Sequence, residues 1–182
     1  GLMFKIVKNF LGGAKLIETP KFKDERGFFY KTYNYEEFKK ISLNFKPEEQ
    51  FFSVSNKNVL RGMHFQTKEY AHDKLVSCLS GKVLDVIVDL RINSEYYKNV
   101  ISLELDSRNP YSLYIPTGFA HGFVSLQDNS LMQYLTSRVY NQSFDQGVHW
   151  KSINFNWPKD EYFVSERDSN HPYIEDLKCE FF

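Results

Sequence analysis

Short runs of β-branched and aromatic residues, separated by turn residues, constrain the fold of this chain more than any other feature of its sequence. Such runs are typical of β-strands. They are residues 50–55, 59–66, 75–79, 83–90, 100–105, 113–115, 122–126 and 131–139. Many short strands at regular spacing are typical of a sandwich or a barrel. Aromatic residues make up 17% of the chain, which favours the same β-rich fold and also an oligomer contact.

One early segment has the pattern of a helix instead. Asn34 is a suitable N-cap, and Glu37 follows three residues later, which is the spacing of a capping box. We predict a helix at residues 35–42. The tail from Phe155 onward contains two prolines, and we expect it to be irregular or helical and to pack over the sheet.

The 182 residues have the length of one compact domain. The sequence has no repeat, linker or long charge run to mark an internal boundary, so we predict a single domain over residues 1–182. Ser80 and Gly81, between two predicted strands, predict a hairpin. Gly1 and Leu2 have the character of an expression scar, and we expect the native chain to start at Met3.

Composition and charge exclude several classes of function. Lys+Arg and Asp+Glu number 23 each, so the formal net charge is zero, whereas a nucleic-acid binder normally carries a basic excess. Cys78 and Cys179 are too few for a disulfide framework. The sequence lacks an apolar run long enough to span a membrane and the layout of a signal peptide. We therefore expect a cytoplasmic protein with no nucleic-acid or membrane partner.

Polar residues that could take part in catalysis first occur together at residues 61–66, which end a predicted strand. Residues two apart in a strand face the same way, so His64 and Gln66 are expected to share a face with Gly62. Lys74 opens the next predicted strand.

Four further side chains each have two interpretations. Asp85 and Asp89 are expected to face solvent on an alternating strand, but on an inward face they would indicate a polar cavity. His121, which a proline–glycine turn delivers to the start of a strand, is either structural or functional. Tyr134 either projects inward as a functional group or packs in the core, as any one of the chain's 12 tyrosines does.

A metal site is the competing interpretation of two histidines in a small β-barrel. Such a site requires three or four convergent His, Cys or carboxylate ligands. Gln66 stands where a second histidine would be needed, and His72, His149 and His171 have no local ligand pattern. We therefore expect no metal in this protein.

Together these segments resemble the dTDP-4-dehydrorhamnose 3,5-epimerase family, from about Phe22 to Pro172 and in consistent order. The matching stretches are Asp24-Glu25-Arg26-Gly27-Phe28-Phe29, Asn58-Val59-Leu60-Arg61-Gly62-Met63-His64-Phe65-Gln66, Lys74-Leu75-Val76, Gly81-x-Val83-x-Asp85-Val86-x-Val88-Asp89-x-Arg91, Ile115-Pro116-x-Gly118-Phe119-Ala120-His121-Gly122-Phe123 and Asn156-Trp157-Pro158. The resemblance implies an all-β fold, a cupin-type jelly-roll barrel with short flanking helices. It also implies that the metal-binding His-x-His pair of most cupins is lacking.

The activity that the resemblance implies is epimerisation at C3 and/or C5 of a nucleotide-diphosphate-linked 4-keto-6-deoxy sugar. The C4 ketone acidifies the C3 and C5 protons, so a base on one face and an acid on the other can invert a centre without a cofactor. By motif, His64 resembles the base, Asp168 the carboxylate that holds it, and Tyr134 the acid. Lys74 resembles the lysine that stabilises the enolate.

The resemblance assigns the remaining positions to substrate binding or to the polar cavity: Arg26, Phe29, Lys31, Glu49, Gln50, Arg61, Asp85, His121 and Tyr140. The chain departs from the family pattern at Lys31, Glu49 and Ser77, where the family has glutamate, glutamine and arginine. The first two positions lie around the thymine nucleotide in the family. A carboxylate such as Glu49 can accept two hydrogen bonds from guanine, so the identity of the nucleotide stays open.

The resemblance further implies a homodimer whose N-terminal strands exchange between subunits. Three enzymatic alternatives stay open: an epimerase of a GDP-linked 4-keto sugar or heptose, a C3-only epimerase, and a ketoisomerase of related fold. The ketoisomerase typically has a second histidine where Gln66 stands. The alternative without catalysis is a sugar-binding cupin, although binding alone needs no base and acid pair.

Overall fold

The computed structural model describes residues 3–178, so the proposed scar at Gly1 and Leu2 and the second cysteine, Cys179, lie outside the described residues. The strands are β1 (Lys5–Asn9), β2 (Lys15–Glu18), β3 (Lys21–Asp24), β4 (Gly27–Tyr30), β5 (Glu49–Ser55), β6 (Leu60–Gln66), β7 (Lys74–Ser80), β8 (Lys82–Asp89), β9 (Val100–Asp106), β10 (Tyr111–Ile115), β11 (Phe119–Ser125), β12 (Ser130–Thr136) and β13 (Asp145–Gly147). The helices are α1 (Tyr35–Lys40) and α2 (Glu166–Ser169), with 3-10 turns at Lys68–Tyr70, Gln142–Phe144, Trp150–Ser152 and Ile174–Asp176.

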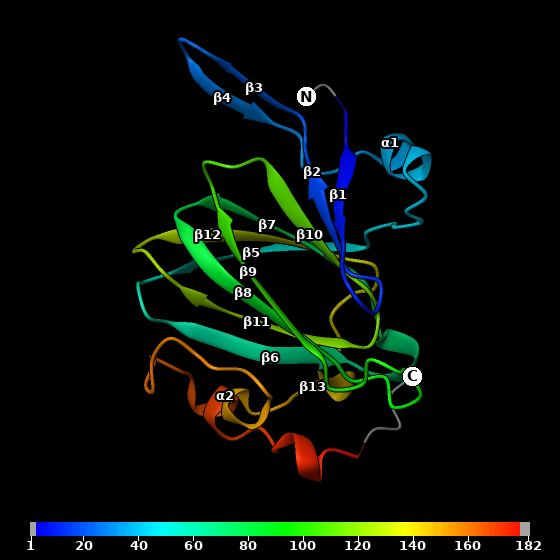
Figure 1. Ribbon diagram of the computed structural model, residues 1–182, viewed down its shortest axis with the longest axis vertical. Coiled ribbons are helices and arrows are strands. Elements are labelled where there is room, and N and C mark those ends of the chain that lie inside the picture. Colours follow the sequence, from blue (N-terminus) through cyan, green and yellow to red (C-terminus); the bar gives the residue numbers. More distant parts are fainter. Residues whose placement is uncertain (1–2, 179–182) are drawn as a thin grey trace.

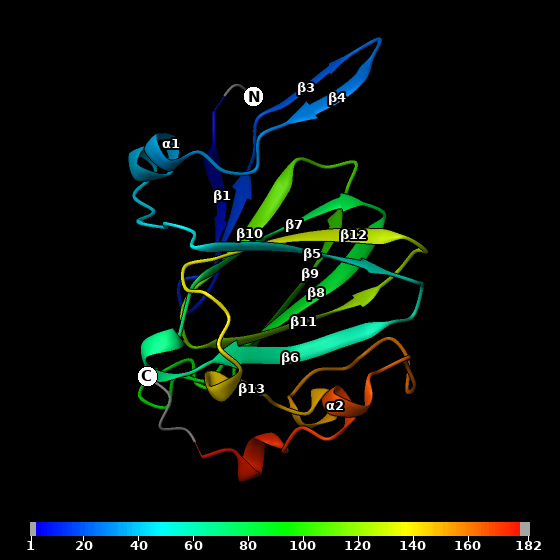
Figure 2. The ribbon, with the colours of Figure 1, turned by 180° about the vertical axis from the view of Figure 1, so that it is seen from behind.

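Two antiparallel sheets face each other and form the body of the molecule (Figure 1, Figure 2). The six-stranded sheet has the order β1-β2-β10-β7-β12-β5, and the five-stranded sheet has the order β13-β6-β11-β8-β9. The remaining strands, β3 and β4, form a hairpin that projects from the body at one end (Figure 1). This arrangement confirms the all-β sandwich or barrel that the spacing of the strands predicts.

All eight predicted strands are present as β5 to β12, but the sequence pattern did not predict β1 to β4 or β13. Of these strands, β1 and β3 carry lysines at Lys5, Lys8, Lys21 and Lys23, and most of their side chains are exposed. A strand with little burial on either face has no strong alternation of apolar and polar residues, so periodicity does not reveal it.

The predicted hairpin at Ser80 and Gly81 is wrong. Gly81 joins β7 of one sheet to β8 of the other, and β8 pairs with β9 and β11 instead. Glycine is required at this crossing because its φ is +77° and an added Cβ would lie 2.5 Å from the Ser130 Oγ. A turn signal indicates that the chain reverses, but it does not select the partner of the strand that follows.

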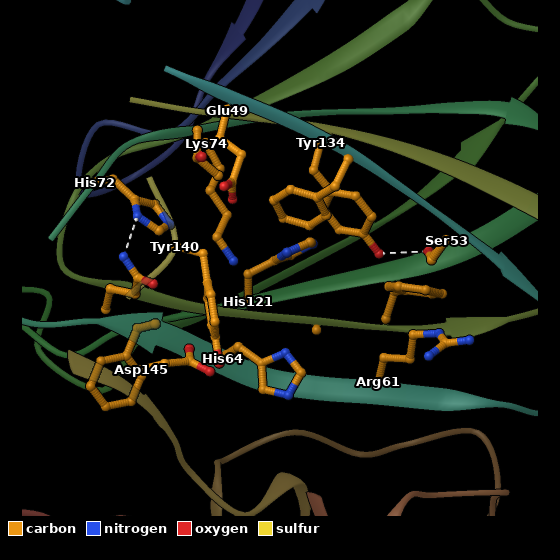
Figure 3. A pocket seen from close by; sticks show the side chains of 16 residues that line it. Glu49, Ser53, Arg61, His64, His72, Lys74, His121, Tyr134, Tyr140 and Asp145 are labelled. Carbon is orange, nitrogen blue, oxygen red and sulfur yellow. Dashed lines mark hydrogen bonds between the residues drawn. The ribbon is translucent and has the colours of Figure 1, made fainter. Parts of the chain in front are cut away.

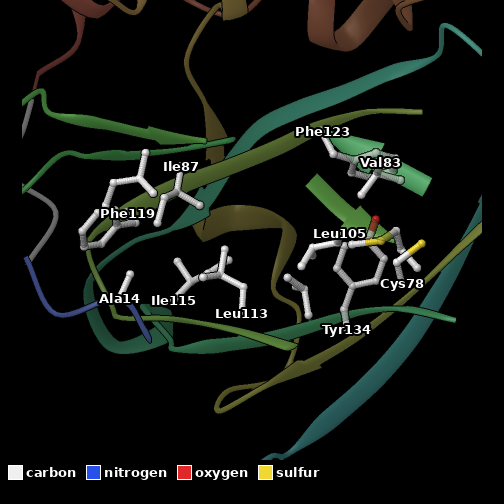
Figure 4. Close-up of a cluster of buried hydrophobic side chains, with 13 residues drawn as sticks. Ala14, Cys78, Val83, Ile87, Leu105, Leu113, Ile115, Phe119, Phe123 and Tyr134 are labelled. Carbon is white, nitrogen blue, oxygen red and sulfur yellow. The ribbon is translucent and has the colours of Figure 1, made fainter. Parts of the chain in front are cut away.

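Hydrophobic side chains fill only part of the space between the sheets. One cluster, which includes Ile87, Leu105 and Leu113, is built from residues of β7 to β12 and fills one part of this space (Figure 4). A polar cavity lies in the other part, between β6 and β11 on one side and β5, β7 and β12 on the other.

The outer faces of both sheets are covered by segments that the sequence predicted in outline. Phe38 of α1 packs in a cluster on the six-stranded sheet, and the Asn34 Oδ1 accepts the Glu37 N–H at 3.0 Å, as the capping box predicts. The tail from Phe155 onward packs on the five-stranded sheet through residues such as Trp157 and Ile174, which confirms its predicted place. Within residues 3–178, none of the helices has the length and apolar character needed to cross a membrane.

Candidate active site

A cavity of about 290 Å³ lies between the two sheets (Figure 3). Its wall on the five-stranded sheet comes from β6 and β11, and its opposite wall comes from β5, β7 and β12. The residues that line it are Glu49, Phe51, Ser53, Arg61, His64, Phe65, Gln66, His72, Lys74, His121, Gly122, Phe123, Tyr134, Thr136, Tyr140 and Asp145. Titratable groups from opposite sheets therefore face one shared space.

His64 of β6 is held by a carboxylate from the tail. The His64 Nε2 lies 2.6 Å from the Asp168 Oδ1, and the Gly62 N–H donates to the Asp168 Oδ2 at 3.0 Å. Burial raises the pKa of Asp168, but the hydrogen bonds from His171, His64 and Gly62 outweigh it and hold that pKa well below its usual range. Asp168 is therefore ionised, and an ionised carboxylate that accepts a hydrogen bond from an imidazole fixes the tautomer and orientation of that ring.

The shape of β6 explains how Arg61 and His64 line the same cavity although they are three residues apart. His64 pairs with His121, whereas Arg61 pairs with Phe123, so β6 uses one more residue than β11 over this stretch. A bulge of this kind reverses the alternation of side chains. His64 and Gln66 share the cavity face as predicted, but Gly62 does not line the cavity and packs against the backbone of β11.

His171 is a second imidazole on Asp168, and sequence reasoning missed it. The His171 Nε2 lies 2.9 Å from the Asp168 Oδ1, so within residues 3–178 the donor atoms of His64, Asp168 and His171 form a group no wider than 4.8 Å. Tetrahedral ligands about 2.0 Å from a zinc ion lie about 3.3 Å apart, which is longer than either contact. Hydrogen bonds to the carboxylate account for this geometry. Its only sequence signal is the spacing of three residues between Asp168 and His171.

Tyr134 lies on the wall opposite His64. Its hydroxyl lies 2.8 Å from the Ser53 Oγ, and its ring stacks on Phe51 at a centroid distance of 4.6 Å. Burial raises the pKa of Tyr134 well above its usual range, although the Ser53 hydroxyl opposes this rise. The phenol thus keeps its proton near neutral pH and can act as a proton donor.

Three further polar groups lie beside these two. The His121 Nε2 donates to the Asp85 Oδ1 at 2.8 Å, and burial lowers the pKa of His121. Burial also lowers the pKa of Lys74 to about 8, against the opposing effects of the Asp145 and Asp85 carboxylates. His72 has a buried Nε2 without a hydrogen-bond partner, and burial lowers its pKa to about 3. His72 is a cavity residue that carried no sequence signal beyond its residue type.

The expectation that Asp85 and Asp89 face solvent is wrong. Both side chains are fully buried, and they point from β8 toward the interior. Asp85 reaches the cavity through His121, whereas Asp89 forms an ion pair with Arg91 at 2.8 Å and lies outside the cavity lining. The alternation of β8 is real, but both of its faces are covered, so a polar side chain on it is paired and not solvated.

The structure places five of the residues predicted for substrate binding or the polar cavity outside the cavity lining of this chain, and Asp85, which bonds to His121, is one of them. Arg26, Phe29 and Lys31 lie in or next to the β3–β4 hairpin, are exposed, and are not part of the lining. Gln50 is exposed because β5 directs Glu49 and Phe51 into the cavity and the residue between them away. Glu49, Arg61, His121 and Tyr140 do line the cavity.

Chemically, this site has a histidine–aspartate pair and a buried phenol on opposite walls of one cavity that Lys74 also lines. Such an arrangement can remove a proton from one face of a flat ligand and supply a proton to the other face. Negative charge that develops between the two walls would meet the Lys74 ammonium.

Comparisons with known proteins agree with this geometry. The sequence profile of the dTDP-4-dehydrorhamnose 3,5-epimerase family matches residues 8–176. An enzyme of that name from Methanothermobacter thermautotrophicus is 37% identical over 172 residues, which is 92% of either chain. The crystal structure of such an enzyme from Elizabethkingia anophelis has a TM-score of 0.87 and 39% identity, over 95% of this chain and 97% of that one.

A structure from Legionella pneumophila, in complex with dTDP-4-keto-L-rhamnose, has a TM-score of 0.91 and 30% identity, over 97% of this chain and 96% of the other. The predicted cupin-type jelly roll is thereby confirmed. The chain belongs to the dTDP-4-dehydrorhamnose 3,5-epimerase family and is an enzyme of the isomerase class.

Proposed function

We propose that this protein epimerises C3 and/or C5 of a nucleotide-diphosphate-linked 4-keto-6-deoxy sugar, with His64 as the base and Tyr134 as the acid. One observation carries the proposal: the His64–Asp168 pair and the Tyr134 hydroxyl lie on opposite walls of one cavity. Inversion of a carbon centre by proton exchange requires removal on one face and return on the other, and these two groups meet that requirement.

The proton transfers balance without a cofactor. His64 takes the proton from the carbon next to the ketone, and the electron pair moves onto the carbonyl oxygen to give an enolate. The Lys74 ammonium stabilises that oxygen. The Tyr134 hydroxyl then gives a proton to the opposite face of the carbon, and exchange with solvent restores both residues. The neutral phenol and the ionised Asp168 are the protonation states that this sequence of steps needs.

Solvent deuterium tests the two roles separately. With a panel of 4-keto sugar nucleotides in D₂O, we expect deuterium at C3, C5 or both together with inverted product; labelling at C3 alone would assign the C3-only alternative. His64→Asn should abolish both labelling and inversion, with a loss of about 10²–10⁴-fold or more. Tyr134→Phe should lose inversion more than labelling, because the base is intact.

Tyr111→Phe on β10 is the matched control, since Tyr111 lies outside the cavity lining and should keep wild-type rates. Near-normal labelling by His64→Asn would refute the assignment of the base. Binding of sugar nucleotides without labelling in the wild type would instead support the non-catalytic cupin.

A homodimer is also part of this proposal. The β3–β4 hairpin carries three exposed aromatic side chains, Phe22, Phe28 and Phe29, and it presents Arg26 away from the cavity of its own chain. In a dimer the hairpin would complete the cavity of the partner subunit. Mixing inactive Arg26→Ala and His64→Asn proteins should then restore about a quarter of wild-type activity, because half of the random dimers are mixed and each has one intact site. No restoration would indicate that Arg26 acts in its own subunit or not at all.

Glu49 bears on a second question, which is the identity of the nucleotide. Its carboxylate lines the cavity at a position where the family has an amide, and a carboxylate can accept two hydrogen bonds from guanine. The alternative is therefore an epimerase of a GDP-linked 4-keto sugar or heptose. In calorimetry, that alternative predicts that GDP binds at least about tenfold more tightly than dTDP, a gap of about 1.4 kcal/mol that Glu49→Gln reduces. Equal affinities, or a preference for dTDP, would favour the dTDP sugar.

Because the chain has few cysteines, we also propose that the protein works in the cytoplasm.

A further inference from the structure

The carboxylate that holds His64 also holds a second imidazole. An ionised carboxylate only accepts hydrogen bonds, so the His64 Nε2 and the His171 Nε2 both donate to the Asp168 Oδ1, over 2.6 and 2.9 Å. The other oxygen, Oδ2, accepts the Gly62 N–H at 3.0 Å. The oxygen that supports His64 is therefore shared between two competing donors.

The fold makes room for the ring of His171. Gly147 of β13 pairs with His64 of β6, and a Cβ on Gly147 would lie 2.4 Å from the His171 ring. Because φ of Gly147 is not in the left-handed region, space is the property that requires glycine there. The His171 side chain is only 8% exposed and meets the His64 ring edge-on at 5.7 Å. The second imidazole is thus enclosed behind the first.

We propose that His171 is a positioning residue that, by sharing the Asp168 Oδ1, limits how tightly His64 binds a proton; this inference rests on the proposed function of His64 as the base. A hydrogen bond draws charge from its acceptor, so each donor to one oxygen weakens the bond of the other. Without His171, the carboxylate would stabilise protonated His64 more strongly. His64 would then stay protonated, and inactive as a base, up to a higher pH.

Other charged groups around Asp168 have partners of their own. Arg167 of α2 forms an ion pair with Asp145 of β13 at 2.7 Å, which offsets the field of the guanidinium. His149 is close enough to His171 for the two to interact electrostatically, and its Nδ1 accepts the Lys151 N–H at 3.1 Å. His149 is therefore a matched control: it is a neighbouring imidazole that does not bond to Asp168.

The test compares three variants. His171→Phe removes the donor and keeps a flat ring, and His171→Gln keeps an N–H donor near the position of Nε2. His149→Asn removes the neighbouring imidazole but keeps an acceptor for the Lys151 N–H. Nuclear magnetic resonance follows the imidazole signal of His64 with pH in the absence of substrate, and His64→Asn identifies that signal. The pH profile of kcat/KM with a dTDP-linked 4-keto-6-deoxyglucose is the second measurement.

In His171→Phe we expect the His64 midpoint and the acid limb of kcat/KM to move up together by about one pH unit. His171→Gln and His149→Asn should leave both within about 0.3 unit. An unchanged or lower midpoint in folded His171→Phe would overturn the inference, even if activity fell, because a purely structural role lowers the rate without moving a titration. His171→Leu replaces the Phe variant if that variant does not fold.

If the wild type epimerises no sugar of the panel, the proposed function fails. The His64 midpoint still decides the role of His171 in that case, because it is measured without substrate. The two failures are therefore distinguishable.

Discussion

The close approach of β6 and β11 yields a prediction that links strand packing to catalysis. Gly62 and Gly122 lie back to back across this strand pair. A Cβ added to Gly122 would lie 2.6 Å from the Met63 Sδ and 2.7 Å from the Arg61 carbonyl oxygen. The methionine side chain can rotate away, but the carbonyl oxygen belongs to the backbone. Gly122→Ala therefore forces the two strands apart.

The magnitude follows from that distance. Restoring an ordinary contact of about 3.4 Å from 2.7 Å requires roughly 0.7 Å of separation. Overpacking of this kind costs about 1–3 kcal/mol, which lowers Tm by about 2–12 °C in a chain of this size. His64 lies on the displaced strand and the Gly62 N–H donates to Asp168, so His64 moves relative to Tyr134. A misplacement of about 1 Å costs about 10²-fold, and we expect a loss of kcat/KM of roughly tenfold or more.

Thermal melting and steady-state kinetics check the two effects in the same preparation. Gly13→Ala is the control, because Gly13 has a φ of +102° and its added Cβ meets only the Pro116 ring at 3.5 Å. This variant should lose about 1 kcal/mol through backbone strain and keep wild-type kcat/KM. If Gly122→Ala kept both the Tm and the kcat/KM of the wild type, the reasoning from this contact would be refuted.

Three further predictions concern protonation and metal. Because burial lowers the pKa of Lys74 to about 8, kcat/KM should fall above about pH 8. Lys74→Arg should move this alkaline limb of the kcat/KM profile to higher pH. An alkaline limb that the substitution leaves unchanged would contradict the proposed role of the Lys74 ammonium. His72, with a pKa of about 3 in the folded state and 6.5 unfolded, binds its proton less readily when folded. Stability should therefore decline as pH falls from about 6.5 to 3, by about 3–5 kcal/mol from this group, and urea unfolding of His72→Gln should show a flatter dependence. Chelation with EDTA should leave activity unchanged, whereas a loss that zinc, iron or manganese restores would overturn the prediction of no metal.

Sequence reasoning predicted the parts of the fold that depend on local pattern. The strand that carries His64, the cap of α1 and the covering tail all follow from short-range signals. The crossing at Gly81 did not, because the choice between pairing with β7 and joining the other sheet depends on strands that come later in the chain.

Site residues that belong to ordered sequence motifs could be predicted. Site residues whose partners are determined by tertiary packing could not. His64, Asp168 and Tyr134 were named from ordered motifs, and the structure brings all three to one cavity or its edge. The second imidazole, His171, was missed because its partner is set by the space over Gly147 and not by spacing alone. The burial of Asp85 was predicted wrongly because the alternation of a strand shows which side chains share a face, but not whether that face is exposed to solvent.

The bond between His64 and Asp168 joins residues 104 positions apart, and this has a consequence for the timing of biosynthesis. All residues that line the cavity precede residue 146, so the cavity can be enclosed before the tail folds back onto β6. Until the tail folds back, and Phe163 bridges to Val59, the imidazole faces the cavity with no carboxylate to orient it. Nascent chains, and chains cut within the tail, would therefore hold a formed cavity that is unable to turn over its substrate. Under the proposed mechanism, activity therefore requires a folded tail as well as a folded barrel.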